Sequence, residues 1–268
     1  MRRRISMIKL LVTDLDDTLY SWIGFFIPAF YGMLDELSLI LSVPKSDLLD
    51  EYQHVHQEKG SVEYPFATLY LPSVKAAYPG KTKEELLNIL NPVFHKFNSI
   101  RKKKLELYPG VKETLEKIAG MGIKVVGYTD SAEENGFYRL KRLGIDDYFQ
   151  SVYVSDSQFA LPDYLPASEK TQIVHGKKPN PAVIHKICQQ ESVAIGEIVY
   201  LGDSLTKDVY MARRAGALSV LCKYSYNAKG QDELYSKLVA ISHWTATDFE
   251  QEKAIKEICK AENIHPDY

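Results

Sequence analysis

The 268-residue sequence has only three cysteines, Cys188, Cys222 and Cys259, with no Cys-x-x-Cys pair and no Cys-His spacing typical of a zinc site. Three scattered cysteines cannot form a disulfide framework, so we predict a reducing, cytoplasmic environment. Net charge is also nearly absent, because 33 Lys and Arg residues face 35 Asp and Glu residues, for a formal charge of −2. A balanced charge gives no general attraction to nucleic acid or to an acidic membrane surface.

The sequence has no internal repeat, no low-complexity tract and no apolar run of the ~18 residues that a membrane helix needs. Arginines at positions 2–4 resemble the start of a secretion signal, but the apolar run behind them is short and ends at Asp14. We therefore expect neither a membrane nor a nucleic-acid partner. With 45% hydrophobic and 25% charged residues the composition is globular, and the length suits one large domain or two smaller ones.

Short apolar runs predict buried strands. Each run is continuous rather than alternating, as expected when both faces of a parallel sheet are covered. The runs are residues 8–13, 123–128, 151–154, 198–201 and 218–222. Helical patterns separate most of them, for example at 181–190 and 205–215. This alternation of strands and helices predicts an α/β fold.

A long stretch, residues 19–107, separates the first two predicted strands and is far longer than a crossover helix. It has helical patterns almost throughout, including a capping box at Thr82 and Glu85 and a largely apolar segment at 22–41 that is free of charge only before Asp35. A structureless loop of this length would be unusual. We therefore assign residues 19–107 to an inserted helical domain, and residues 1–18 and 108–268 to the core.

Two carboxylates follow the first predicted strand. Asp14 and Asp16 are two residues apart, so in extended backbone both side chains would point to one side. Carboxylates so close repel each other unless one is protonated or a cation lies between them, and Mg²⁺ prefers oxygen ligands. A polar turn that merely ends the strand is the alternative.

The strand predicted at 198–201 ends similarly, in Gly202-Asp203-Ser204, with Asp208 in the first turns of the next helix. Asp203 could complete an acidic metal site. Asp208 has a second explanation, because a carboxylate near a helix N-terminus gains ~0.3–1 kcal/mol from the helix dipole. Ser204 has one too, as an N-cap residue.

Hydroxyl groups follow the second predicted strand, at Thr129 and Ser131. Hydroxyl and backbone N–H groups at a helix N-terminus can bind an anion. Ser131 also forms a possible capping box with Glu134, which would use its hydroxyl within the helix. Thr129 precedes the cap and is the better candidate for binding a ligand.

A lysine pair, Lys177 and Lys178, precedes the helix predicted at 181–190, and either lysine could neutralise a phosphate or the Asp14 carboxylate. Such a pair is otherwise a common feature of a solvated surface. Residues 155–177, just before it, contain Pro162, Pro166, Gly176 and aromatic residues without a clear period. We expect an ordered surface loop there, close to the site.

Each acidic or hydroxyl element follows a predicted strand, so all should meet at one edge of the sheet. In order and spacing they resemble the four motifs of the haloacid dehalogenase superfamily, in its phosphatase branch. The matching residues are Asp14-Leu15-Asp16-Asp17-Thr18-Leu19, Thr129, Lys178-Pro179-Asn180-Pro181, and Gly202-Asp203-Ser204 with Asp208. The resemblance covers most of the chain and implies a Rossmann-like parallel sheet of strand order 5-4-1-2-3. The inserted helical domain is similar to the family's C1-type cap.

The resemblance implies a Mg²⁺-dependent phosphatase that hydrolyses a small phosphorylated metabolite through an aspartyl-phosphate. Asp14 would be the nucleophile, and Asp16 would protonate the leaving oxygen and then activate water. The dehalogenases that give the family its name look different at position 16 and need no metal. The second Asp therefore favours phosphoryl transfer over dehalogenation.

The resemblance also implies a ligand set. The Asp14 carboxylate, the Asp16 backbone carbonyl and Asp203 would hold Mg²⁺, with Asp208 just behind them. The Lys-Pro-x-Pro pattern favours Lys178 over Lys177 as the site lysine. The substrate phosphate would be bound by Thr129, Asp130 and Lys178.

Other functions fit the same residues. A phosphomutase would return the phosphoryl group to a sugar phosphate, and a non-catalytic receiver would keep a phosphorylated Asp14. A ligand-binding protein on a retained scaffold is a further alternative. The sequence indicates neither the substrate nor whether the chain is a monomer or a homodimer.

Overall fold

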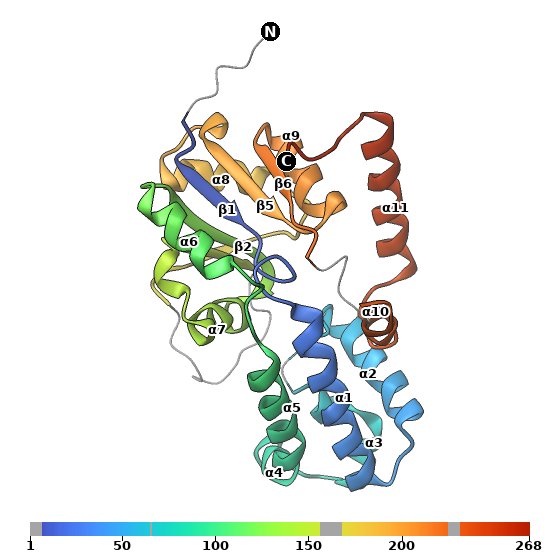
Figure 1. The fold of residues 1–268 in the computed structure, drawn as a ribbon. Helices are drawn as coiled ribbons and strands as arrows, with labels where there is room; N and C mark the ends of the chain where they lie inside the picture. Colours follow the sequence, from blue (N-terminus) through green and yellow to red (C-terminus); the bar gives the residue numbers. More distant parts are fainter. Residues whose placement is uncertain (1–6, 65, 156–167, 225–230) are drawn as a thin grey trace. The chain divides into compact units, whose positions relative to one another are not determined.

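The structure is a computed structural model that describes residues 7–64, 66–155, 168–224 and 231–268. The chain forms two compact units (Figure 1). One comprises Met1–Ser21, Glu106–Ala228 and Gln251–Tyr268, and the other comprises Trp22–Leu105 and Lys229–Glu250. The sequence analysis assigned 229–250 to the core, whereas the structure groups them with the helical unit. The physical reason is packing between helices far apart in the sequence, described below.

The first unit is built on a parallel sheet, which has six strands among the described residues. The strands are β1 (Leu10–Thr13), β2 (Lys124–Ala132), β3 (Ser151–Ser155), β4 (Thr171–Val174), β5 (Ile198–Gly202) and β6 (Leu218–Leu221). Their order is β4-β3-β2-β1-β5-β6, which confirms the predicted order 5-4-1-2-3 for the five expected strands. The added edge strand β4 lies in the segment predicted as an irregular loop, of which residues 156–167 lie outside the described residues.

Helices cover both faces of this sheet (Figure 1). On one face, alternate strand residues such as Val12 and Val126 pack with α8 (Pro181–Glu191) and α9 (Tyr210–Ala215). On the other lie α6 (Val111–Gly120) and α7 (Glu133–Leu143). Because side chains alternate along each strand, successive residues contact the helices on opposite faces of the sheet.

Turns and caps place the helices at the carboxyl ends of the strands. Pro181 begins α8, and the Asn180 side chain accepts a hydrogen bond from the Ala182 N–H at 3.1 Å. The helix predicted over 205–215 is divided into a π-helical turn, η4 (Leu205–Val209), followed by α9. The short 3₁₀ turns η2 (Asp146–Tyr148) and η3 (Ile195–Glu197) precede β3 and β5.

The second unit is helical in its described residues. It contains α1 (Trp22–Leu41), α2 (Lys45–Lys59), η1 (Ala67–Tyr70), α3 (Pro72–Ala77), α4 (Lys83–Ile89), α5 (Asn91–Lys104) and α10 (Gln231–Val239), while α11 (Ala246–Ala261) continues into the first unit. The capping box of Thr82 and Glu85 is confirmed at the start of α4. Helix α10 packs on α1, where the Tyr31 hydroxyl donates to the Lys237 carbonyl at 3.1 Å.

Helix α1 forms the core of the second unit, with nine buried residues, Phe26 and Leu37 among them. By length and composition alone it is long and apolar enough to cross a membrane, which our sequence analysis did not expect. Half of its most apolar window is buried inside the structure. A helix that is apolar on nearly all sides is also what the centre of a globular helical unit requires.

Candidate active site

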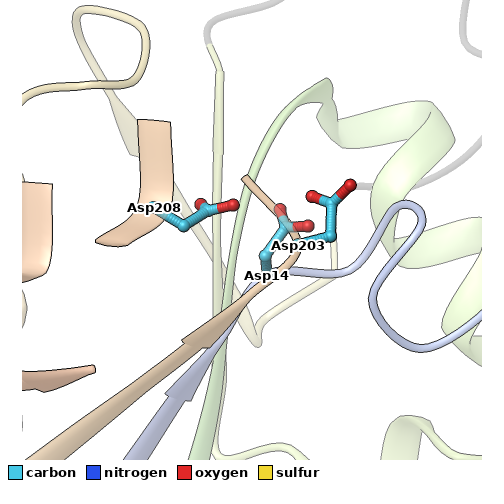
Figure 2. A group of neighbouring side chains, drawn as sticks. All are labelled: Asp14, Asp203 and Asp208. Atoms are coloured by element: carbon cyan, nitrogen blue, oxygen red, sulfur yellow. The ribbon is translucent and has the colours of Figure 1, made fainter. Parts of the chain in front are cut away.

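The carboxyl ends of β1 and β5 bring three carboxylates together (Figure 2). Asp14 follows β1, and its backbone N–H donates to the Leu201 carbonyl of β5 at 2.8 Å. Asp203 follows β5, and Asp208 lies one turn later in η4. Each offers a carboxylate oxygen within 4.8 Å of the other two. Oxygen ligands in this number and spacing are what a hard divalent cation prefers.

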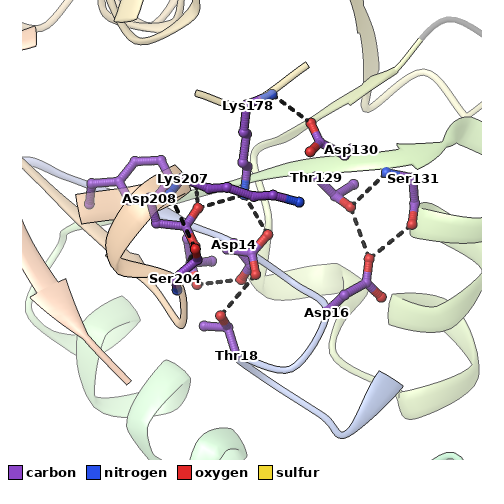
Figure 3. A network of polar contacts seen from close by, with 12 residues as sticks. Asp14, Asp16, Thr18, Thr129, Asp130, Ser131, Lys178, Ser204, Lys207 and Asp208 are labelled. Carbon is purple, nitrogen blue, oxygen red and sulfur yellow. Dashed lines mark hydrogen bonds and ion pairs between the residues drawn. The ribbon is translucent and has the colours of Figure 1, made fainter. Parts of the chain in front are cut away.

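Lys178 places a buried ammonium group against two of these acids (Figure 3). Its Nζ lies 2.5 Å from Asp14 Oδ1 and 2.9 Å from Asp208 Oδ1, and all three side chains are less than a tenth exposed. The Lys178 backbone N–H donates to Asp130 Oδ1 at 3.0 Å. Lys177 is exposed, so of the two lysines Lys178 is the one at the acidic cluster.

Two tyrosines that we did not select from the sequence flank the same ammonium group. The rings of Tyr128, in β2, and Tyr200, in β5, have their centroids 5.0 and 5.6 Å from Lys178 Nζ. The Tyr200 hydroxyl also donates to Asp208 Oδ1 at 3.1 Å. Both rings belong to the core packed against α8 and α9. They hold the lysine by cation–π attraction in a site with little room for water.

Asp208 is held by three donors. Lys178 Nζ and the Tyr200 hydroxyl donate to its Oδ1, and the Ser204 N–H donates to its Oδ2 at 3.0 Å. A Cβ atom on Gly202 would lie 2.4 Å from Asp208 Cγ, so only glycine fits at that position. Asp208 is therefore fixed by specific hydrogen bonds in addition to any interaction with a helix dipole.

The surroundings of this cluster disfavour the ionised form of its carboxyl groups. Burial raises the pKa of Asp14 well above its usual value, with Lys178 acting in the opposite direction and the other carboxylates adding to the rise. Burial, followed by the charge of Asp208, raises the pKa of Asp203 to about 8. Burial opposes the charged form of Lys178, but the carboxylates of Asp14 and Asp208 outweigh it and raise the pKa of Lys178.

The Asp16 side chain does not join this cluster, although we expected it on the same side as Asp14. The alternation rule does not apply, because β1 ends at Thr13 and the backbone then turns, with Asp17 at φ 56°. Asp14 Oδ2 accepts from the Thr18 hydroxyl at 2.9 Å. Asp16 instead contacts residues of β2 and α7 (Figure 3).

Four donors surround the Asp16 carboxylate. Oδ1 accepts from the Tyr20 hydroxyl at 2.9 Å and from Arg139 Nη1 at 2.8 Å. Oδ2 accepts from the hydroxyls of Thr129 at 3.0 Å and Ser131 at 2.9 Å. Sequence reasoning missed Tyr20 and Arg139. The available signal was an arginine that shares the buried side of a predicted helix with apolar neighbours.

Two contacts define the surroundings of Thr129. Its hydroxyl donates to Asp16 and accepts from the Ser131 N–H at 3.0 Å, so Thr129 lies beside the Asp16 carboxylate. The predicted N-cap role of Ser131 is wrong, because β2 continues to Ala132, which is the N-cap of α7. The register of β2 against β3 shifts between Tyr128 and Ala132, and Ala132 then pairs with Ser155 before α7 begins.

Comparisons with known proteins agree with this arrangement. Residues 12–222 match the family described as haloacid dehalogenase-like hydrolase. A glyceraldehyde 3-phosphate phosphatase of Methanopyrus kandleri is 28% identical over 217 residues, covering 80% of this chain and 83% of that protein. A phosphoglycolate phosphatase of Nitrosospira multiformis is 27% identical over 250 residues, covering 92% and 97%.

Solved structures add support for the fold. A HAD phosphatase from Thermococcus onnurineus superimposes with a TM-score of 0.52 at 22% identity, covering 83% of this chain and 89% of that one. At this identity the likeness concerns the fold alone. The family match, in contrast, spans β1 to the residue after β6 and includes every residue of the acidic cluster. The chain therefore belongs to the family of haloacid dehalogenase-like hydrolases.

Proposed function

We propose that this chain is a Mg²⁺-dependent phosphatase that hydrolyses a small phosphorylated metabolite through an aspartyl-phosphate on Asp14. The observation that carries the proposal is the cluster in which Lys178 Nζ lies between Asp14 and Asp208, with Asp203 beside them. It combines a buried carboxylate, a fixed cation and a set of oxygen ligands. The phosphatase names of the two relatives give independent support.

In the proposed first step, an Asp14 carboxylate oxygen forms a bond to phosphorus while the ester P–O bond breaks. Thr18 and Lys178, which contact its two oxygens, orient that carboxylate. Asp16 donates a proton to the departing oxygen. In the second step water attacks the phosphorus, Asp16 takes the proton from the water, and the Asp14 carboxylate is regenerated.

The donor set fits a magnesium ion. Asp14 and Asp203 would hold it through carboxylate oxygens and Asp16 through its backbone carbonyl, while Asp208, whose oxygens already accept three hydrogen bonds, would orient the site from behind. When bound, Mg²⁺ would offset the excess of carboxylates and stabilise charge on the transferring phosphoryl group.

Phosphate binding would draw on Lys178, whose ammonium group contacts Asp14, and on Thr129, whose hydroxyl contacts Asp16 (Figure 3). Asp130 is an anion and would repel a phosphate if it touched one. Its contact with the Lys178 backbone N–H indicates a supporting role, in which it fixes the loop that carries the lysine.

The activity is tested by measuring phosphate release from a panel of phosphorylated metabolites with and without Mg²⁺. The panel includes 2-phosphoglycolate, glyceraldehyde 3-phosphate, nucleoside monophosphates and hexose phosphates. We expect at least one substrate to release phosphate with Mg²⁺ and to be inert after treatment with EDTA. Release that EDTA leaves unchanged would contradict the metal requirement. Conversion of glucose 1-phosphate into glucose 6-phosphate without net phosphate release would instead indicate a phosphomutase.

Metal-free protein is expected to lose stability as the pH rises. The pKa of Asp203 is about 8 in the folded state, against 3.8 for an unperturbed carboxyl. Its contribution to stability is therefore complete below the unfolded value and is lost as the pH rises through the folded value, by up to about 1.4 kcal/mol per pH unit for one proton. Saturating Mg²⁺ should flatten this dependence, because the cation favours ionised Asp203.

The measurement is the melting temperature of EDTA-treated protein from about pH 5 to about pH 9, repeated with Mg²⁺. Surface carboxylates such as Asp147, which is fully exposed, contribute equally to both series and serve as the internal control. A metal-free melting temperature that rose steadily over this range would contradict the assignment of a partly buried, protonated carboxyl to the cluster.

A further inference from the structure

We propose that Arg139 is a positioning residue that fixes the orientation of the Asp16 carboxylate for its acid–base role. The inference rests on the proposed function, since it concerns how Asp16 is held rather than whether it acts. Arg139 lies on α7, and its Nη1 donates to Asp16 Oδ1 at 2.8 Å and to Ser131 Oγ at 3.1 Å. A guanidinium group binds through a rigid planar fork, so it sets a direction as well as a charge.

The burial of this arginine is the first argument for a dedicated role. Its side chain is 4% exposed, whereas the Asp16 side chain is 20% exposed. Removing a guanidinium from water costs several kcal/mol, and the ion pair alone does not reliably repay that cost. A hydrophobic side chain would suit the buried side of α7, beside Leu140, at least as well. A charge placed there is therefore explained better by Asp16 than by stability.

The local backbone brings the guanidinium within reach of Asp16. One turn before Arg139, Gly136 faces β2, and a Cβ atom there would lie 3.1 Å from Thr129 Cγ2 and 3.6 Å from Val154 Cγ1. The missing side chain lets α7 approach the sheet closely at the level of Thr129. Arg139 follows on the same side of the helix and meets Asp16 beyond the end of β1.

The other donors to Asp16 cannot replace the guanidinium. Tyr20, Thr129 and Ser131 each contribute one hydroxyl, and a hydroxyl hydrogen can rotate to another acceptor. Arg139 is the charged donor among the contacts described and also binds one of those hydroxyls, that of Ser131. Without Arg139, we expect the Asp16 side chain to occupy more than one rotamer. An acid–base group that points correctly only part of the time transfers protons correspondingly less often.

The test compares two substrates that differ in their need for a proton. An alkyl phosphate such as 2-phosphoglycolate requires protonation of its leaving oxygen, whereas p-nitrophenyl phosphate releases a stable phenolate and requires little. We expect Arg139→Met to lower kcat/KM for the alkyl ester about 10²-fold or more, as for loss of general acid catalysis, and for the aryl ester much less. KM for the alkyl ester should change little, because Arg139 contacts Asp16 and Ser131 rather than the proposed phosphate-binding residues Lys178 and Thr129. A burst of p-nitrophenol is also expected. With Asp16 misaligned as the base, hydrolysis of the phosphoenzyme becomes slower than its formation.

Matched variants separate this result from a structural effect. Arg142→Met removes an arginine from the exposed side of the same helix and should leave both substrates unaffected. Arg139→Lys keeps the charge but not the planar guanidinium group. Its kcat/KM for the alkyl ester should lie between those of Arg139→Met and wild type. If Arg139→Met does not fold by circular dichroism, Arg139→Lys carries the same comparison. A crystal structure of the variant should show Asp16 in several rotamers.

Two outcomes would overturn the proposal: unchanged kinetics in Arg139→Met, or an equal loss for both esters in a folded protein. Asp16→Asn distinguishes failure of this inference from failure of the proposed function. If Asp16→Asn loses the alkyl ester selectively and Arg139→Met does not, only the positioning role is wrong. If Asp16→Asn hydrolyses both esters at the wild-type rate, the acid–base assignment itself fails.

Discussion

Replacement of Asp14 by asparagine should reduce phosphate release to the background rate, a loss of about 10⁴-fold or more in kcat, as for removal of other covalent nucleophiles. The amide has nearly the same shape as the carboxylate, and its single oxygen can still accept from Lys178, while its NH2 group then faces the Thr18 hydroxyl, which can accept. It does not form an acyl phosphate. Radiolabelled substrate should therefore label acid-quenched wild-type protein and leave Asp14→Asn unlabelled.

The same substitution should not lower stability. Asp14, Asp203 and Asp208 place three carboxylates around the ammonium group of Lys178, and burial raises the pKa of Asp14. A neutral side chain relieves part of this repulsion, so metal-free Asp14→Asn should melt at or above the wild-type temperature at about pH 8. Such opposite changes in activity and stability are typical of a site built for reaction rather than for folding.

Asp147→Asn is the matched control, because it removes a fully exposed carboxylate from the same unit. It should keep wild-type activity and melting temperature. Wild-type phosphate release by Asp14→Asn would show that the nucleophile lies elsewhere. A persistent label on the asparagine variant would point to a second phosphorylated residue.

The sequence was sufficient for much of the sheet, because parallel strands buried on both faces leave continuous apolar runs such as 198–201. The edge strand β4 was missed since two of its four residues are partly exposed and one is exposed, so no such run marks it. The grouping of 229–250 with the helical unit was missed for a different reason. It depends on contacts such as that of Tyr31 with Lys237, between residues remote in sequence.

The candidate site likewise contains residues that the sequence predicts and residues or positions that it does not. Four residues of the acidic cluster could be selected because each follows a strand or precedes a helix. Parallel strands all end at the same edge of the sheet, so residues at these junctions lie close together. They are Asp14, Lys178, Asp203 and Asp208. The separation of Asp16 from Asp14 could not be predicted, because it depends on how the backbone turns after Thr13. Arg139 was not selected for a related reason. Its partner lies more than a hundred residues earlier, and a lone arginine in a helix is ordinarily a surface residue.

Removal of the Lys178 ammonium group should have the second large effect. In Lys178→Met, Asp14 and Asp208 lose the cation that lies 2.5 and 2.9 Å from them, in surroundings where each carboxylate is less than a tenth exposed. Loss of one partner from a buried ion pair typically costs about 3–5 kcal/mol. Methionine preserves most of the side-chain volume between the rings of Tyr128 and Tyr200, so the expected loss is electrostatic rather than a cavity effect.

The expected signature is a loss of stability that a divalent cation partly restores. Metal-free Lys178→Met should unfold at a lower urea concentration than wild type, and Mg²⁺ should raise its midpoint by more than it raises that of wild type, because the cation that contacts Asp14 and Asp208 is then missing. Activity should not recover in parallel. We expect kcat/KM to remain about 10²–10³-fold below wild type at saturating Mg²⁺, since the phosphoryl oxygens lose a preorganised positive charge.

Lys177→Met provides the control, because it removes a neighbouring but exposed lysine. Its stability and activity should match those of wild type within about 0.5 kcal/mol and twofold, as for most surface substitutions. If Lys178→Met and Lys177→Met behaved alike, the ammonium group would be dispensable and its place between two carboxylates would be incidental. If Mg²⁺ restored both stability and activity of Lys178→Met, the lysine would serve only to balance charge, and phosphate binding would rest on other residues at the edge of the sheet, Thr129 first among them.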